Sequence, residues 1–232
     1  MTTWFAFRQG ILNQNSWLDS APKQNAQLYL MAKRIMDVVL VLYVLPLVAL
    51  LMALCAILIK LEDPKGPIFF IQQRTGKGGK RFGMYKFRTM VYNAEELKAS
   101  LAHLNELEWP DFKVSNDPRV TRIGRILRKT SLDELPQLLN VLRGEMSLVG
   151  PRPEREYFIN KIVERAPVYT QLLKVKPGIT SWGQVKYGYA ENVDQMIKRM
   201  KYDLLYLENM SLYVDFKILI YTANTILKGT GI

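Results

Sequence analysis

The chain has 232 residues, and its 32 lysines and arginines against 21 acidic residues give a net charge of +11. This balance favours anionic partners, namely nucleic acid, acidic lipid headgroups or phosphorylated substrates. With one cysteine and one histidine, the sequence excludes an intramolecular disulfide and the common zinc-binding spacings. Residues 1–31 are expected to form a lead-in rather than a signal peptide, because polar residues interrupt their apolar ones.

A run without charged residues, 38–59, predicts a membrane helix over residues 32–62. At about 1.5 Å of rise per residue, the run reaches across the hydrocarbon core of a bilayer, which is about 30 Å thick. Basic residues flank it on both sides, which favours both ends on the cytoplasmic side, and Pro46 offers a bend. These features predict a re-entrant helix that bends at Pro46. An ordinary kinked transmembrane helix is the alternative, since such helices tolerate proline.

The rest of the chain, 63–232, is expected to form one compact cytosolic domain of the α/β class that is mostly helical. Two short β-like runs around a glycine-rich turn predict a small β-hairpin, and the turn lacks the P-loop spacing that would favour a phosphate cradle. Pro177 and Gly178 predict a loop. Interfacial amphipathic helices are part of this fold, since the apolar face of the last helix suits the core or a membrane surface. The hairpin runs are 67–73 and 82–88, and helical spacing predicts helices at 94–107, 120–127, 132–142, 157–165, 193–207 and 213–227.

Two adjacent carboxylates provide the most informative polar motif. Ser131 and Glu134 have the spacing of a capping box, which predicts that a helix begins at residue 131. Asp133 and Glu134 then fall in the first turn, where the macrodipole favours ionised carboxylates. Because Arg128 precedes the helix and Arg152 follows it, the arginines could hold a phosphate while the carboxylates bind Mg²⁺ or attack. A well-capped helix start without chemistry is the alternative.

Six motifs follow one another along residues 32–228. They are Lys33-Arg34 with Asp37, Gly66-Pro-Ile-Phe-Phe with Gln73-Arg-Thr-Gly, Tyr85-Lys-Phe-Arg-Thr-Met, Ser131-Leu-Asp-Glu-Leu-Pro-Gln-Leu, Met146-Ser-Leu-Val-Gly-Pro-Arg-Pro, and Lys176-Pro-Gly-Ile-Thr. Together they resemble the bacterial sugar transferase family, the monotopic phosphoglycosyl transferases. The resemblance departs at Leu45, where members often have a serine before the helix-breaking proline.

The resemblance implies an enzyme of the bacterial cytoplasmic (inner) membrane whose active site, within a catalytic domain at 63–232, lies on the cytoplasmic face. Such an enzyme transfers a sugar-1-phosphate from a UDP-sugar to polyprenyl (undecaprenyl) phosphate and starts lipid-linked glycan or exopolysaccharide assembly. Asp133 matches the nucleophile, which carries a covalent phosphosugar after UMP is released. Glu134 matches the partner that coordinates Mg²⁺, and both carboxylates are candidate metal ligands.

The resemblance also implies further site residues and partners. Arg128 and Arg152 match basic residues that would clamp phosphate, with Lys86 and Arg88 as additional candidates. Two more acidic positions are matched, and the choice between a site role and a structural role stays open for them: Asp203 and Asp215. The anionic inner leaflet is an expected partner, nucleic acid is not, and a homodimer is left open.

Two alternatives come from other functional classes. A non-enzymatic membrane anchor that binds acidic lipid or nucleic acid would explain the basic stretches and Pro46, but not the acidic pair beside Arg128. A conventional glycosyltransferase that acts on lipid would release UDP instead of UMP. The identity of the released nucleotide separates these possibilities.

Overall fold

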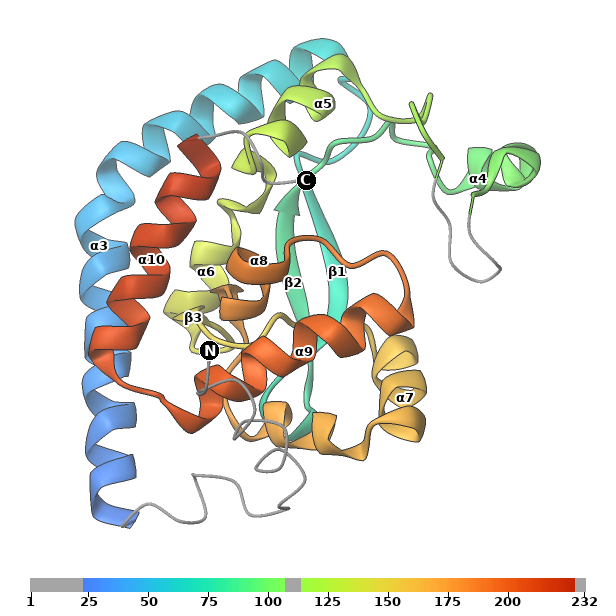
Figure 1. Ribbon diagram of the computed structural model, residues 1–232. Coiled ribbons are helices and arrows are strands. Elements are labelled where there is room, and N and C mark those ends of the chain that lie inside the picture. Colours follow the sequence, from blue (N-terminus) through green and yellow to red (C-terminus); the bar gives the residue numbers. More distant parts are fainter. Residues whose placement is uncertain (1–22, 107–113, 228–232) are drawn as a thin grey trace.

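The computed structural model describes residues 23–106 and 114–227 of the chain (Figure 1). Helices dominate and two small two-stranded sheets accompany them, so the predicted mostly helical α/β class is confirmed. The helical elements are α3 (Lys23–Glu62), η1 (Lys77–Gly79), α4 (Glu96–Ser100), η2 (Ala102–Leu104), α5 (Arg122–Lys129), η3 (Leu132–Glu134), α6 (Gln137–Arg143), α7 (Glu156–Arg165), η4 (Pro167–Lys174), α8 (Trp182–Tyr187), α9 (Val193–Glu208) and α10 (Leu212–Leu227). The strands are β1 (Phe69–Thr75), β2 (Arg81–Phe87), β3 (Ser147–Val149) and β4 (Gly178–Thr180).

Helix α3 runs along one side of the molecule and arches over α5 (Figure 1). Over Gln27–Glu62 it is long and apolar enough to cross a membrane by length and composition, and only 11% of its most apolar window is buried. Its buried side chains Val41, Cys55 and Ile59 attach it to the domain, while large apolar side chains point outward along its length. The helix begins at Lys23, so part of the expected lead-in 1–31 is helical; residues 1–22 lie outside the described residues.

Strands β1 and β2 form the predicted antiparallel hairpin, with Phe69 opposite Phe87 and Thr75 opposite Arg81. The turn between them places Gly78 at φ 68° and has open space around its Cα, so glycine is needed there for conformation rather than for room. This hairpin carries residues of two motifs toward the middle of the domain.

Two predicted helices are broken. The expected helix 132–142 is a 3-10 turn, η3, followed by α6, because Pro136 has no N–H to continue the hydrogen-bond ladder. The capping-box prediction is also wrong: Ser131 adopts φ 57° and its side chain caps nothing. The expected helix 94–107 consists of α4 and η2, which bury no side chain that could stabilise a longer helix, and residue 107 lies outside the described residues.

The loop predicted to open at Pro177 and Gly178 gives way from Gly178 onward to a short strand, β4, which pairs in parallel with β3 and is followed by α8. The two backbones approach so closely that a Cβ at Gly178 would lie 2.1 Å from the Gly150 nitrogen. Glycine is therefore required for this pairing, which joins the Met146 motif to the Lys176 motif.

The largest group of buried apolar side chains lies where α7, η4, α9 and α10 meet. It contains Phe158, Ile162, Tyr169, Leu204 and Ile218, all nearly inaccessible to solvent. Two smaller groups hold α3 to the domain. One packs α3 against β2 and α6, and the other packs α3 against α5 and the end of β2. The elements that carry the polar sequence motifs therefore lie between a helical core and α3.

Candidate active site

The two adjacent carboxylates of the sequence motif lie on η3. Ser131, in the left-handed region of backbone space, reverses the chain just before this turn, and Pro136 begins the next helix soon after it. Asp133 is buried, and the side chain of Glu134 is 15% exposed. The turn therefore presents one carboxylate to the interior and one to a cavity.

Two cations from distant parts of the sequence face these carboxylates. Lys86 Nζ, on β2, lies 2.7 Å from Glu134 Oε1 and 3.7 Å from Asp133 Oδ2. Arg152, which follows β3, places Nη2 at 3.6 Å from the same Glu134 oxygen. The structure thus brings Asp133, Glu134, Lys86 and Arg152 together from three segments.

The neighbouring carboxylates differ in their affinity for protons. Burial and the charge of Glu134 raise the pKa of Asp133, even though Lys86 and Arg152 lower it. Burial also disfavours ionisation of Glu134, but there Lys86 and Arg152 prevail and lower the pKa to about 2. Among the described residues, buried Asp133 Oδ1 has no hydrogen-bond partner. Because an unpaired buried acceptor is costly, this oxygen is suited to a ligand that completes the site.

Arg128 lies at the end of α5 and reaches the same region. Its Nε donates a hydrogen bond of 2.9 Å to Thr89 Oγ1, and its charge acts on Asp133. Arg122 and Arg125, on the same helix, are exposed. On α5, therefore, Arg128 faces the carboxylates, whereas Arg122 and Arg125 face solvent.

Three charged residues that are absent from the sequence-based candidates support Arg152. Buried Glu154 forms ion pairs with Arg199 and, at 3.3 Å, with Arg74. Arg74 also donates a hydrogen bond of 3.1 Å to the Pro153 carbonyl, which holds the Pro-Arg-Pro segment against β1. Arg74 and Glu154 lie within or beside the quoted motifs and could have been found there, whereas no motif marks Arg199.

Asp203 lies next to Glu154 and Arg199 and makes its hydrogen bond away from the Asp133–Glu134 pair. It accepts a hydrogen bond of 2.8 Å from the Gly183 N–H and lines a small cavity with Arg152, Glu154 and Arg199. Burial raises its pKa to about 6, although Gly183 and Arg199 favour the charged form. Its contacts assign it to the support of α8 and of the arginines.

Arg88 and Asp215 make their described contacts elsewhere. Arg88 Nη1 pairs with Asp63 at 2.8 Å and ties the end of β2 to the segment after α3. Asp215 pairs with Lys33 at 2.9 Å and also accepts hydrogen bonds from Tyr29 and Tyr206. These contacts join α10 to α3, which lies beside it in Figure 1, and Tyr206 adds α9 to the network.

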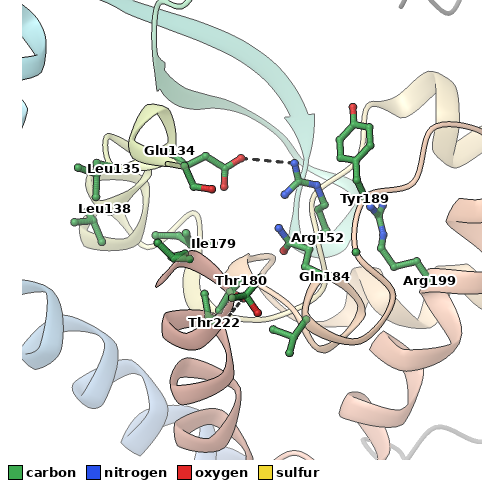
Figure 2. Close-up of a pocket in the computed structure, with 15 residues that line it drawn as sticks. Glu134, Leu135, Leu138, Arg152, Ile179, Thr180, Gln184, Tyr189, Arg199 and Thr222 are labelled. Atoms are coloured by element: carbon green, nitrogen blue, oxygen red, sulfur yellow. Dashed lines mark hydrogen bonds and ion pairs between the residues drawn. The ribbon is translucent and has the colours of Figure 1, made fainter. Parts of the chain in front are cut away.

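A cavity of about 220 Å³ opens beside Glu134 and Arg152. Its two sides differ in chemistry (Figure 2). Near Arg152 the lining residues are polar, and on the opposite side they are apolar. The labelled polar side includes Gln184, Tyr189 and Arg199, and the apolar side includes Leu135, Leu138 and Ile179.

The acidic pair is compatible with one hard divalent cation. Among the described residues no group of three or more histidine, cysteine or acidic side chains forms a metal cluster. Mg²⁺ is commonly held by one or two carboxylates together with substrate phosphates and water, so a larger cluster is not required. Asp133, with its unpaired Oδ1, and Glu134 fit that role.

Comparisons with known proteins identify the class. The model of the bacterial sugar transferase family matches residues 28–229. A UDP-N-acetylgalactosamine-undecaprenyl-phosphate N-acetylgalactosaminephosphotransferase from Aeromonas hydrophila is 42% identical over 204 residues, which cover 88% of this chain and 45% of that protein. An undecaprenyl-phosphate galactose phosphotransferase from Salmonella typhimurium is 44% identical over 176 residues, or 74% of this chain and 36% of that protein.

A third relative is nearer in length. The UDP-glucose:undecaprenyl-phosphate glucose-1-phosphate transferase of Caulobacter vibrioides is 43% identical over 199 residues, which cover 84% of this chain and 69% of that protein. The chain therefore belongs to the bacterial sugar transferase family. It spans less than half the length of the Aeromonas and Salmonella relatives that it matches.

Proposed function

We propose that the chain transfers a sugar-1-phosphate from a UDP-sugar to undecaprenyl phosphate and releases UMP. The observation that carries this proposal is the buried Asp133 oxygen without a partner, beside Glu134 and within reach of three cations. The relatives are named for glucose, galactose and N-acetylgalactosamine transfer, which supports a UDP-hexose donor and leaves the sugar open.

In the first proposed step, a carboxylate oxygen of Asp133 attacks the β-phosphorus of the UDP-sugar. The new O–P bond forms while the phosphoanhydride bond breaks, and UMP departs with the electron pair. In the second step, an oxygen of undecaprenyl phosphate attacks the same phosphorus and restores the carboxylate. The lipid then carries a diphosphate-linked sugar, and one transfer between two anions has been divided into two.

The chain's cations suit these steps because negative charge accumulates where Asp133 and Glu134 meet the phosphates of the two substrates. Lys86 and Arg152 offset the charge of the acidic pair and would also face the donor diphosphate. Arg128 favours the ionised form of Asp133, which the attack requires. A Mg²⁺ ion bound by Asp133 and Glu134 would further neutralise the diphosphate.

The cavity suits both substrates. Its polar side, near Arg152 and Tyr189, fits the nucleotide diphosphate and sugar. Its apolar side, with Leu135 and Ile179, fits the first isoprene units of the lipid. We propose that α3 enters one leaflet of the cytoplasmic membrane and returns at Pro46, which would hold this cavity at the level of the lipid phosphates.

Nucleotide analysis tests the reaction. Purified full chain is incubated with undecaprenyl phosphate, Mg²⁺ and each of three donors, UDP-glucose, UDP-galactose and UDP-N-acetylgalactosamine. We expect UMP from one or more donors. UDP would indicate plain glycosyl transfer, and the absence of any nucleotide product would favour a binding protein.

Intact-protein mass measurement tests the covalent step. When the lipid is omitted, the wild-type chain should gain the mass of one sugar phosphate, and Asp133→Asn should gain none. Asp194→Asn, a matched change at an exposed position of α9, should label like the wild type. Equal labelling of all three chains would contradict a nucleophilic Asp133.

Cysteine labelling tests the membrane arrangement. In a Cys55→Ser background, Ser20→Cys and Lys65→Cys place one thiol before and one after the apolar run. A re-entrant helix leaves both thiols inaccessible to an impermeant reagent added outside intact cells. Labelling at either position alone would establish a spanning helix instead.

A further inference from the structure

A second cavity, of about 390 Å³, lies at the N-terminal part of α3 and shares no lining residue with the cavity at Glu134. Its walls come from α3, from the hairpin turn, from β3 and from the segment before β4. Three of the sequence motifs, those at Lys33, Met146 and Lys176, contribute to it, and the proposed reaction uses no residue of the first or the last. The cavity is therefore separate from the proposed transfer site.

Cations outnumber carboxylates among the charged residues that line the cavity. Lys33, Arg34, Lys77 and Lys176 line the cavity together with one carboxylate, Asp37. The carboxylate is already engaged, since it accepts hydrogen bonds from Ser147 Oγ at 2.7 Å and from the Leu148 N–H at 3.2 Å. The lining thus has an excess of positive charge.

The four cations are not equally neutralised. Lys33 has a carboxylate partner in Asp215, 2.9 Å away. Arg34 donates to the carbonyls of Val141 and Leu142, which satisfy its hydrogen bonds but leave its charge. The positive charge of the Arg34 guanidinium therefore remains available to an anion.

Lys77 and Lys176 make no ion pair with any carboxylate in the described part of the chain. Partial burial and the charges of Arg34 and Lys77 lower the pKa of Lys176, which shows that like charges are crowded here. Crowding of this kind is unfavourable, and an anion placed among Arg34, Lys77 and Lys176 would relieve it.

Apolar side chains of α3 adjoin the cations. Met31 and Ile35 line the cavity and are 65% and 63% exposed. They immediately precede the charge-free run that we propose enters the membrane. A ligand that is anionic at one end and apolar at the other complements this arrangement better than a free phosphate does.

We propose that this cavity is a binding site for the phosphate headgroup of an anionic membrane lipid, separate from the transfer site. Arg34, Lys77 and Lys176 contact the phosphate, and the lipid chains lie along Met31 and Ile35. The assignment rests on the proposed membrane association of α3. It does not depend on the transfer reaction, because no residue is shared with the site at Glu134.

Lipid-dependent thermal unfolding of the detergent-solubilised full chain tests the site. A ligand that binds the folded state raises the unfolding midpoint by an amount that grows with the ligand concentration relative to its Kd. We expect short-chain phosphatidylglycerol to raise the midpoint of the wild type, and the Lys77→Gln/Lys176→Gln variant to lose more than half of that shift. The matched variant Lys198→Gln/Lys201→Gln, which removes two exposed lysines from α9, should keep it.

Two controls separate loss of lipid binding from loss of folding. Lys77→Arg/Lys176→Arg should restore the shift, and the midpoint without lipid reports whether each variant folds. A full shift in the Lys77→Gln/Lys176→Gln variant would overturn the proposal. An equal shift with glycerol phosphate would also overturn it, because the site would then take a free phosphate. UMP release is measured on the same samples, so failure of the transfer reaction is seen separately.

Discussion

Two buried aspartates, Asp133 and Asp215, show how similar residues take different roles. Asp215 has three donors, since Tyr29 and Lys33 contact one of its oxygens and Tyr206 the other. Asp133 faces cations at longer range and keeps one buried oxygen without a partner. A satisfied carboxylate holds elements together, whereas an unsatisfied one among cations is prepared for a ligand.

The largest effect is expected from Asp133→Asn, which removes the proposed nucleophile. The amide occupies the same volume but cannot form the phosphosugar bond, so UMP release should fall to background in a nucleotide assay. The unfolding midpoint should change little, because the Oδ1 atom of Asp133 accepts no hydrogen bond from any described residue. A variant that still releases UMP would remove the distinction between the two aspartates.

Asp215→Asn should show the opposite pattern, with a loss of stability. It leaves the Lys33 ammonium, whose side chain is 8% exposed, without its carboxylate. Removing one partner of a buried ion pair costs about 3–5 kcal/mol, which denaturant unfolding would detect. Adding Lys33→Met should recover part of this loss, and no recovery would show that the tyrosine contacts matter more than the charge pair.

Asp203 extends the comparison to pH. Its pKa is about 6 in the folded chain against 3.8 for an ordinary aspartate, so the folded state binds the proton more tightly. Its contribution to stability is therefore fully favourable below about pH 4 and is lost as pH rises through about 6, by at most about 3 kcal/mol. Asp203→Asn should gain stability relative to the wild type between pH 4 and 7, as measured by unfolding at each pH; an unchanged difference would contradict the buried carboxylate.

The smallest expected effects compare Lys86, on β2, with Arg88, which directly follows that strand. Lys86 contacts the acidic pair, so Lys86→Gln should reduce UMP release by about 10- to 100-fold, the equivalent of a charged hydrogen bond of roughly 1.5–3 kcal/mol. Arg88 contacts Asp63, so Arg88→Gln should lower the unfolding midpoint more than it lowers turnover of the folded fraction. Equal losses of turnover in both variants would place Arg88 in the site.

Local patterns predicted much of the fold and missed specific parts for physical reasons. The β1–β2 hairpin and α7, α9 and α10 lie within two residues of their predicted bounds, because each depends on neighbouring residues. The β3–β4 pairing was missed because its strands are short and far apart in sequence. The Ser131 capping box does not form because Ser131 adopts a left-handed conformation, which the spacing of residues does not reveal. The break of the predicted helix 132–142 at Pro136, by contrast, has a cue in the sequence.

By itself, the sequence determined the family, the apolar run before the domain and the adjacency of Asp133 and Glu134, since all three are properties of consecutive residues. Only the tertiary structure decided which cations serve that pair. Lys86 and Arg152 reach it from separate segments, while Arg88 turns to Asp63 and Asp215 to Lys33. The physical reason is that ionisation and charge pairing depend on distance and burial, which long-range packing sets and local spacing does not.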